Sequence, residues 1–312
     1  MEMEIEKSVQ NRNKLAVTGI SKKIGETEIL APVSFSMEEG ECFGILGENG
    51  SGKTTLLRII TGLVSPTSGN VTINGFSPHI NPRKALSNAG ALIGIPGFYP
   101  HISAYNNLRL LYGGDTEPAE DLIKTTLEEV GLIDDMEKKA GAYSRGMLQR
   151  LGIGLAFMND RPYSLLDEPT QGVDDIWIER LIKSIRKRVK SGRGFILVSH
   201  NFDFIMELCG PVLILDAGKT VYDGPLNEIA EFPYYFHTKF SPEDKGEDLL
   251  KRLDFVHRYE KVKDWWELTL QEEDSARLVK SFVDEGVELY ECGKRYYSIS
   301  DIVAHHKKGN SE

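Results

Sequence analysis

One eight-residue segment limits the folds available to this chain more than any other feature. It reads Gly-Glu-Asn-Gly-Ser-Gly-Lys-Thr over residues 47–54 and fits the pattern G-x-x-x-x-G-K-[ST]. An apolar run at 43–46 precedes it, and an apolar stretch at 55–60 follows it. The segment therefore predicts a strand, a phosphate-binding loop and a helix in immediate succession.

The residue types in this loop suit a nucleotide. Its glycines let successive N–H groups turn toward phosphate oxygens, and the following helix directs its positive N-terminal end at the same anion. We expect Lys53 to bridge the β- and γ-phosphates and the Thr54 hydroxyl to bind Mg²⁺. The alternative, an ordinary glycine-rich turn, does not explain the strand and helix around it. The predicted ATP-binding residues are Gly47, Glu48, Asn49, Gly50, Ser51, Gly52, Lys53, Thr54 and Thr55.

Two acidic residues end a second apolar run, at 163–166. Asp167 stands at the predicted strand end, where it can hold Mg²⁺ through water. Glu168 follows, where it can orient or deprotonate an attacking water. Two surface acids are the alternative, and the phosphate loop earlier in the chain disfavours it. We therefore predict Glu168 as the catalytic carboxylate and Thr54 with Asp167 as the metal-binding pair.

Composition places the chain among ordinary globular proteins. Its 312 residues are 40% hydrophobic and 27% charged, and this length suffices for one large domain or for one domain with a small appendage. The net charge of −10 argues against a broad nucleic-acid or anionic-lipid surface. The three cysteines lack metal-type spacing, so we expect reduced thiols.

We expect neither a signal peptide nor a membrane-spanning helix. The first fifteen residues are polar and charged, without an apolar stretch. The longest uninterrupted apolar runs fall far short of the about 20 residues that cross a bilayer. A transport role would therefore need a membrane path supplied by another chain.

The pattern over residues 15–224 predicts an α/β P-loop NTPase core. Apolar runs alternate with amphipathic helical stretches, of which 178–189 is the clearest. The segment at about 90–150 interrupts this alternation and predicts a helical insertion. The expected strands are 42–46, 71–73, 163–166, 195–198 and 212–215.

The remaining residues, 225–312, predict a small C-terminal α+β domain. We expect helices near 249–256 and 276–283, a strand at 264–270, and a hairpin pairing 287–290 with 295–298 across Cys292-Gly293. The aromatic side chains are expected to form its core rather than a ligand site: Trp265, Trp266, Tyr290, Tyr296 and Tyr297.

Four motifs in this order resemble the ATPases of ATP-binding-cassette (ABC) transporters. They are the phosphate loop, Tyr-Ser-Arg-Gly-Met at 143–147, Leu-Leu-Asp-Glu-Pro-Thr at 165–170, and Ser199-His200. The resemblance covers about 15–224. Pro-Gly-Phe-Tyr-Pro at 96–100 and the Ser-x-Gly-Met form are similar to the bacitracin-resistance and lantibiotic-immunity branch of the ABC-2 type exporters.

The resemblance implies a head-to-tail dimer that holds two ATP molecules between its subunits. The signature residues of one subunit would meet the γ-phosphate held by Lys53 of the other; here they are Ser144, Arg145, Gly146 and Met147. Asp174 matches the loop that crosses the interface, and His200 matches the histidine that contacts γ-phosphate, with a capping or core histidine as its alternative. The helical insertion would receive a separate membrane subunit, and the C-terminal domain at 225–312 would have an accessory or regulatory role.

Three positions depart from the family pattern. Ile24 stands where an aromatic residue usually stacks on adenine, so base selectivity is expected to be loose. Gly94 stands where a glutamine usually lies near Mg²⁺ and the water. Arg145 replaces the first glycine of the signature and can either reach phosphate or hinder closure.

Taken together, these features favour the cytoplasmic ATP-hydrolysing subunit of a transporter, on the inner face of the membrane. The expected substrate is an exported peptide or a hydrophobic, antibiotic-like molecule. A soluble ABC ATPase acting on ribosomes or DNA is the first alternative, and the single cassette and acidic charge disfavour it. A nucleotide-gated subunit with weak hydrolysis is the second alternative, supported by Gly94 alone.

Overall fold

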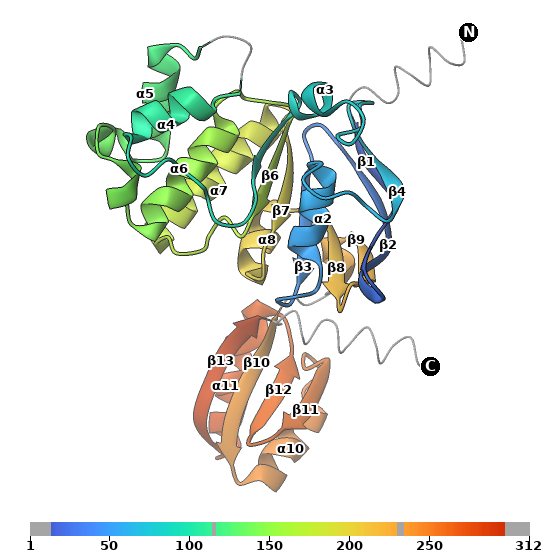
Figure 1. The fold of residues 1–312 in the computed structure, drawn as a ribbon. Helices are drawn as coiled ribbons and strands as arrows, with labels where there is room; N and C mark the ends of the chain where they lie inside the picture. Colours follow the sequence, from blue (N-terminus) through green and yellow to red (C-terminus); the bar gives the residue numbers. More distant parts are fainter. Residues whose placement is uncertain (1–13, 114–116, 230–233, 297–312) are drawn as a thin grey trace. The chain divides into compact units, whose positions relative to one another are not determined.

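The computed structural model describes residues 14–113, 117–229 and 234–296. The chain divides into two compact units, Met1–Pro225 and Leu226–Glu312 (Figure 1). Each unit has its own sheets, helices and hydrophobic core, and each is described separately below.

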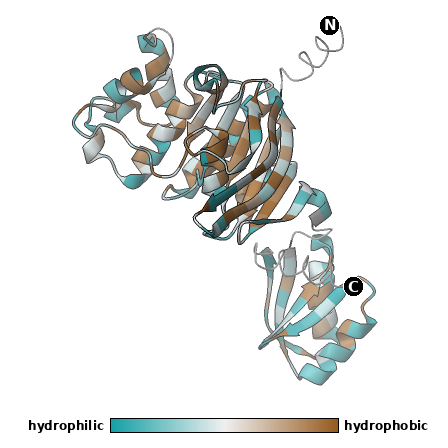
Figure 2. Cartoon of the chain, turned by 45° about the vertical axis from the view of Figure 1, so that its right-hand side comes forward, coloured by the Kyte–Doolittle hydropathy of each residue, from teal (hydrophilic) through white to brown (hydrophobic). Residues whose placement is uncertain are grey.

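A six-stranded sheet forms the centre of the first unit. Its order is β5-β6-β7-β3-β8-β9, and every neighbouring pair is parallel except β8 with β9. Figure 2 shows hydrophobic residues concentrated in these strands. Both faces of the inner strands are buried, which explains their continuously apolar sequences. The strands are β3 (Cys42–Gly47), β5 (Ala89–Leu92), β6 (Tyr163–Asp167), β7 (Gly194–Val198), β8 (Pro211–Asp216) and β9 (Lys219–Pro225).

A three-stranded antiparallel sheet covers one side of this unit. Its order is β2 (Thr27–Glu38), β1 (Lys14–Ile24) and β4 (Ser68–Ile73). Helix α2 (Lys53–Ile60) packs against strands of both sheets, and its leucines and isoleucines share one core with them. This packing fixes the helix that opens the phosphate loop.

Other helices cover the opposite face of the parallel sheet. Phe157 of α6 (Arg145–Phe157) packs edge-to-face on Phe195 of β7. Ile205 of α8 (Phe202–Leu208) lies against Gly44 of β3, where an added Cβ would come within 2.8 Å of its side chain. Helix α7 (Asp175–Lys190) contacts both β7 and α8.

A helical insertion joins β5 to β6. Its helices α4 (Ala104–Leu111), α5 (Glu120–Glu129) and α6 enclose a small core of their own, with Leu108, Ile123 and Leu151 fully buried. The short helices η1 (Ile133–Asp135) and η2 (Ala140–Ala142) connect α5 to α6, and α3 (Pro82–Leu86) precedes β5.

The second unit combines four antiparallel strands with two helices. Along the chain it runs β10, α10, β11, β12, α11, β13, and in space the strands lie in the order β11-β12-β10-β13. This is the split βαβ arrangement called ferredoxin-like. Phe236, Leu268 and Phe282 lie in its core. The bounds are α9 (Leu226–Ile229), β10 (Tyr234–Ser241), α10 (Glu243–Arg252), β11 (Arg258–Val262), β12 (Trp265–Thr269), η3 (Glu272–Asp274), α11 (Ser275–Asp284) and β13 (Glu288–Tyr296).

Two predictions for the second unit are wrong. The hairpin across Cys292-Gly293 is one continuous strand, β13, paired along its length with β10. Gly293 lies beneath the His237 ring, where a Cβ would come within 3.1 Å of His237 Cε1, so this glycine serves close approach rather than a turn. Tyr290 is 63% exposed and is not a core residue.

The other aromatic predictions for this unit have mixed outcomes. Trp266 is buried in the core, as predicted, whereas Trp265 is only half-buried. Tyr297 lies outside the described residues. In the first unit, the predicted strand at 71–73 exists as part of β4, but it belongs to the antiparallel sheet.

Candidate active site

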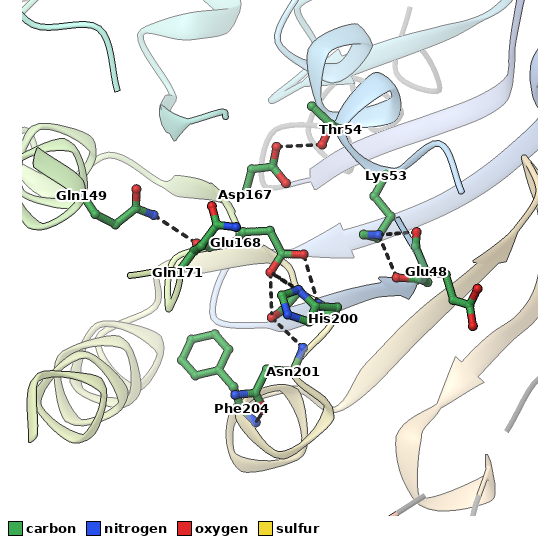
Figure 3. Close-up of polar contacts among 12 residues, drawn as sticks. Glu48, Lys53, Thr54, Gln149, Asp167, Glu168, Gln171, His200, Asn201 and Phe204 are labelled. Carbon is green, nitrogen blue, oxygen red and sulfur yellow. Dashed lines mark hydrogen bonds and ion pairs between the residues drawn. The ribbon is translucent and has the colours of Figure 1, made fainter. Parts of the chain in front are cut away.

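The predicted site residues come together because parallel strands share one carboxyl edge. The strands β5, β6, β7 and β3 lie side by side and end at this edge. The loops that follow them there carry the residues expected to bind nucleotide or take part in hydrolysis. Gly94 follows β5, Glu168 follows β6, His200 follows β7, and the phosphate loop follows β3. Figure 3 shows Lys53, Thr54, Asp167, Glu168 and His200 around this edge.

The phosphate loop depends on its glycines. Gly50 and Gly52 have φ of 85° and 103°, in the left-handed region that side chains disfavour. A Cβ on Gly47 would lie 2.4 Å from both Ser51 Oγ and the Leu215 carbonyl oxygen. The Lys53 ammonium is buried within the loop and donates to the carbonyls of Gly47 at 2.7 Å and Glu48 at 2.8 Å.

Thr54 and Asp167 form an oxygen-rich pair beside the loop. Thr54 Oγ1 donates to Asp167 Oδ2 at 2.9 Å, and the Gly94 N–H donates to the same oxygen at 3.3 Å. Asp167 Oδ1 is buried and has no hydrogen-bond partner among the described residues. A hydroxyl, a carboxylate and an unused buried oxygen suit a hard cation such as Mg²⁺, which takes few protein ligands when phosphates complete its shell. The residues therefore fit the predicted metal.

Burial shifts the pKa values of two charged groups at this edge. Desolvation lowers the pKa of the Lys53 ammonium, and the carboxylates of Glu168, Asp167 and Glu48 partly oppose that shift. Desolvation also raises the pKa of the Asp167 carboxyl, and the hydrogen bonds from Thr54 and Gly94 act in the opposite direction.

Glu168 and His200 form a hydrogen-bonded pair. His200 Nδ1 lies 2.8 Å from Glu168 Oε2, and the His200 backbone N–H donates to Oε1 at 3.1 Å. Ser199 Oγ adds a contact of 3.3 Å to Oε2. The His200 side chain is 57% exposed and that of Glu168 is 19% exposed, so the pair opens to solvent at the edge where a nucleotide phosphate would lie. The alternative for His200 is a capping or core histidine, but its side chain is exposed and the N-cap of α8 is Asn201.

The signature residues lie at the start of α6. Ser144 caps the helix, its Oγ accepting the Met147 N–H at 3.2 Å. An exposed Arg145 donates to Gln171 Oε1 at 2.8 Å. Gly146 lies so close to the next loop that a Cβ would approach the Gly172 carbonyl oxygen to 2.5 Å. Within one subunit the signature therefore contacts the loop that follows Glu168.

Two further predicted residues have clear local settings. Asp174 caps α7, its Oδ1 accepting the Trp177 N–H at 2.9 Å, so a structural role accounts for its carboxylate in the single subunit. Ile24 ends β1 and is 64% exposed. The same hairpin touches the phosphate loop through the Ile29 carbonyl oxygen, which lies 3.3 Å from the Cβ position of Gly52.

Sequence reasoning missed two residues beside the site. Gln149 of α6 is buried, and its Nε2 donates to the Glu168 carbonyl oxygen at 3.0 Å. Asn201 caps α8 by accepting the Phe204 N–H at 3.0 Å, and its own N–H donates to Ser199 Oγ (Figure 3). A polar residue on the buried side of α6 was the one sequence signal for Gln149.

Comparison with known proteins decides the family. The sequence profile described as ABC transporter matches residues 30–171. The bacitracin transport ATP-binding protein BcrA of Bacillus licheniformis is 30% identical over 92% of this chain and 95% of its own length. The chain belongs to the ATP-binding proteins of ABC transporters.

Other members of the ABC family agree in sequence and fold. The linearmycin resistance ATP-binding protein LnrL of Bacillus subtilis is 32% identical over 69% of this chain and 70% of its own. A solved ATP-binding subunit of an ABC transporter superposes with a TM-score of 0.65 at 27% identity, covering 69% of this chain and 91% of that one. The predicted P-loop NTPase fold and ATPase class are thus confirmed. In the described part of this ABC protein, no helix combines the length and apolarity needed to cross a bilayer.

Proposed function

We propose that this ABC protein works as one half of a nucleotide-gated dimer that powers export of a peptide or hydrophobic, antibiotic-like molecule. A separate membrane subunit supplies the path, and the chain resides in the cytoplasm on the inner face of the membrane. The near full-length similarity to BcrA carries the proposal, because that protein is described as acting in bacitracin transport. The linearmycin resistance protein supports the same substrate class.

The chain's own residues define the nucleotide chemistry that we propose. Lys53 and the loop N–H groups bind the β- and γ-phosphates, while Thr54 and Asp167 hold Mg²⁺. The metal, when bound, neutralises charge on the phosphate oxygens. Glu168 orients and deprotonates the attacking water, and His200 holds the Glu168 carboxylate while presenting its exposed ring to the γ-phosphate.

A cleft in the first unit supports the membrane subunit as a partner. It has a volume of about 890 Å³ and lies between α3, the ends of α4 and α6, and the start of β6. Both apolar and charged side chains line it, so a short amphipathic segment of the partner fits its chemistry. Six of its lining residues are Arg83, Leu86, Leu111, Tyr112, Asn159 and Asp160. The ferredoxin-like unit serves as an accessory or regulatory domain in this proposal.

The deciding experiment measures MgATP turnover of the purified chain over a range of protein concentrations, beside Glu168→Gln. A dimeric ATPase gives turnover that rises faster than linearly with concentration, because each site needs residues from both subunits. Glu168→Gln should lose at least about a hundredfold in kcat while still binding ATP. Linear turnover from a chain that stays monomeric with ATP, as measured by light scattering, would reject the dimer, and full turnover in the variant would reject Glu168 as the catalytic carboxylate.

A second candidate is a nucleotide-gated subunit with weak hydrolysis. The observation that favours it is Gly94, which offers Asp167 a backbone N–H but places no side chain beside the metal site. ATP-driven dimerisation with very low turnover, even when the membrane subunit is present, would favour this candidate.

A further inference from the structure

The helix that carries the signature also reaches the catalytic loop from inside the protein. Gln149 lies on the side of α6 that faces away from solvent, with 7% of its surface exposed. Its amide Nε2 donates to the backbone carbonyl of Glu168 at 3.0 Å (Figure 3). Gln149 touches neither the phosphate loop nor the Glu168 carboxylate in any hydrogen bond of the described chain.

Three hydrogen bonds anchor the Glu168 backbone, and two of them, including the one from Gln149, are made to its carbonyl. The Gln171 N–H donates to the same oxygen at 3.1 Å, and the Glu168 N–H donates to the Val198 carbonyl at 2.8 Å. One anchor therefore comes from the next strand, one from the following loop and one from α6. The side-chain anchor is the one that substitution can remove without altering the backbone.

Glu168 needs such anchors because its backbone is strained. Its φ of 48° lies in the left-handed region, which a residue with a Cβ adopts only when its surroundings hold it there. If one anchor is lost, the peptide after Glu168 can rotate toward an ordinary conformation. The carboxylate would then leave the position in which His200 holds it.

Two further contacts tie the start of α6 to the same loop. Arg145 donates to Gln171 Oε1 at 2.8 Å, and Gly146 allows the Gly172 carbonyl to approach closely. Helix α6 therefore contacts this loop at Glu168, Gln171 and Gly172. A shift of α6 at its signature end would reach Glu168 through these contacts.

We propose that Gln149 is a positioning residue for hydrolysis: its amide holds the strained Glu168 peptide so that the carboxylate faces the attacking water. Through α6, the same bond couples the signature segment of a subunit to that subunit's own catalytic carboxylate. The inference rests on the proposed catalytic role of Glu168. A purely structural reading, in which Gln149 only satisfies a buried carbonyl, predicts lower stability and no specific loss of turnover.

The first test compares Gln149→Leu with wild type in kcat and KM for MgATP. We expect kcat to fall by about tenfold, the equivalent of one hydrogen bond, with KM changed less than about twofold. Asn107→Leu is the control, since Asn107 is a fully buried amide of the insertion whose Nδ2 donates to the carbonyls of Tyr99, Ile102 and Ser103. It should lower Tm while kcat per folded molecule stays unchanged.

The second test uses Gln149→Glu, which keeps the reach but replaces the donor with an acceptor. A carboxylate facing the Glu168 carbonyl should impair turnover at pH 8. Burial raises the pKa of the introduced carboxyl, so a fall in pH toward 6 should protonate it and restore a donor. The variant-to-wild-type ratio of kcat should then rise as pH falls, whereas the ratio for Gln149→Leu should stay flat.

The third measurement does not depend on turnover. Amide hydrogen exchange of the full chain should show faster exchange at residues 168–174 in Gln149→Leu, with residues 47–60 unchanged. Turnover within twofold of wild type together with unchanged exchange would overturn the inference. Absence of turnover in wild type would count against the proposed hydrolytic function instead, and the exchange result would still decide the role of Gln149.

Discussion

Glu168 and Gly94 are both next to Asp167, the first in sequence and the second through a hydrogen bond, and both have a left-handed backbone conformation. The consequence of that conformation differs between them. Glu168 adopts φ of 48° despite its side chain, and this places its carboxylate against His200. Gly94 adopts φ of 66° and brings its N–H, rather than a side chain, to Asp167. The strained backbone of Glu168 and the desolvated carboxyl of Asp167 therefore both lie at the site where hydrolysis is expected.

The buried carboxyl of Asp167 should lower the stability of the nucleotide-free protein. Its pKa is raised in the folded state, so folded chains bind the proton more tightly than unfolded chains. The free energy of unfolding is therefore larger below the unfolded pKa and decreases as pH rises through the folded pKa. At pH 7 we expect Asp167→Asn to raise Tm by about 2–4 °C and to weaken Mg²⁺-dependent ATP binding. Calorimetry would check this against Glu137→Gln, an exposed acid of the same unit that lies outside any helix and should leave Tm unchanged; a lower Tm in Asp167→Asn would contradict the prediction.

Gly94→Gln tests whether the missing side chain limits hydrolysis. The Cβ position is open, with Arg58 as its nearest neighbour at 3.9 Å, but the backbone would remain left-handed at a cost of about 1–2 kcal/mol. Gly94→Ala should show the same loss of stability and no gain in kcat. A higher kcat in the glutamine variant alone would assign slow turnover to the lost amide, and equal kcat in both would reject that assignment.

At the scale of elements, the sequence predicts the strands and helices that are apolar or periodic throughout. The parallel strands β3, β6, β7 and β8 and helix α7 lie where their patterns place them. Neither β1 nor β10 is predicted from the sequence. Strand β1 alternates buried with exposed residues, and β10 mixes aromatic with polar residues, so neither forms a continuous apolar run. The prediction of a hairpin in place of β13 was wrong because of Gly293. Glycine is typical of turns, but here it is needed for close packing beneath the His237 ring.

The site is predictable in part for a similar reason. Residues such as Lys53 and Asp167 can be predicted because their type and their position in a motif indicate their chemistry. Gln149 acts through one hydrogen bond to a backbone carbonyl, which any donor of the right length can make, so its sequence context carries little information.

Two substitutions of Asp174 can distinguish its role as a helix cap from a role at the dimer interface. Asp174→Ala should lower the free energy of unfolding by about 1 kcal/mol, because α7 loses its N-cap, whereas Asp174→Asn should retain the cap and the stability. If the carboxylate also serves the dimer interface, both variants should weaken ATP-dependent dimerisation in a Glu168→Gln background. Light scattering would measure this, and full dimerisation of the asparagine variant would restrict Asp174 to capping.

At the scale of the molecule, the chain consists of two units with separate cores. All residues proposed to bind nucleotide lie in the first unit. The relatives BcrA and LnrL differ in how far their similarity to this chain extends, since the first covers 92% of it and the second 69%.

A chain ending at residue 225 should therefore fold and bind MgATP with an affinity within about threefold of the full chain. Titration with a fluorescent ATP analogue would measure the affinity, and a full-length Lys53→Ala variant would provide the negative control. Loss of binding by a truncated chain whose circular dichroism shows it to be folded would contradict the prediction.

The position of β3 in its sheet has a consequence for biosynthesis. This strand lies between β7 and β8, and both of its partners follow it by about half of the chain length. During translation its backbone N–H and C=O groups stay unpaired and its apolar side chains stay uncovered until those partners emerge, and a nascent chain in this state can associate with neighbouring chains. The strand that precedes the phosphate loop is thus synthesised early, but it can pair with both of its neighbours only after β7 and β8 have been synthesised.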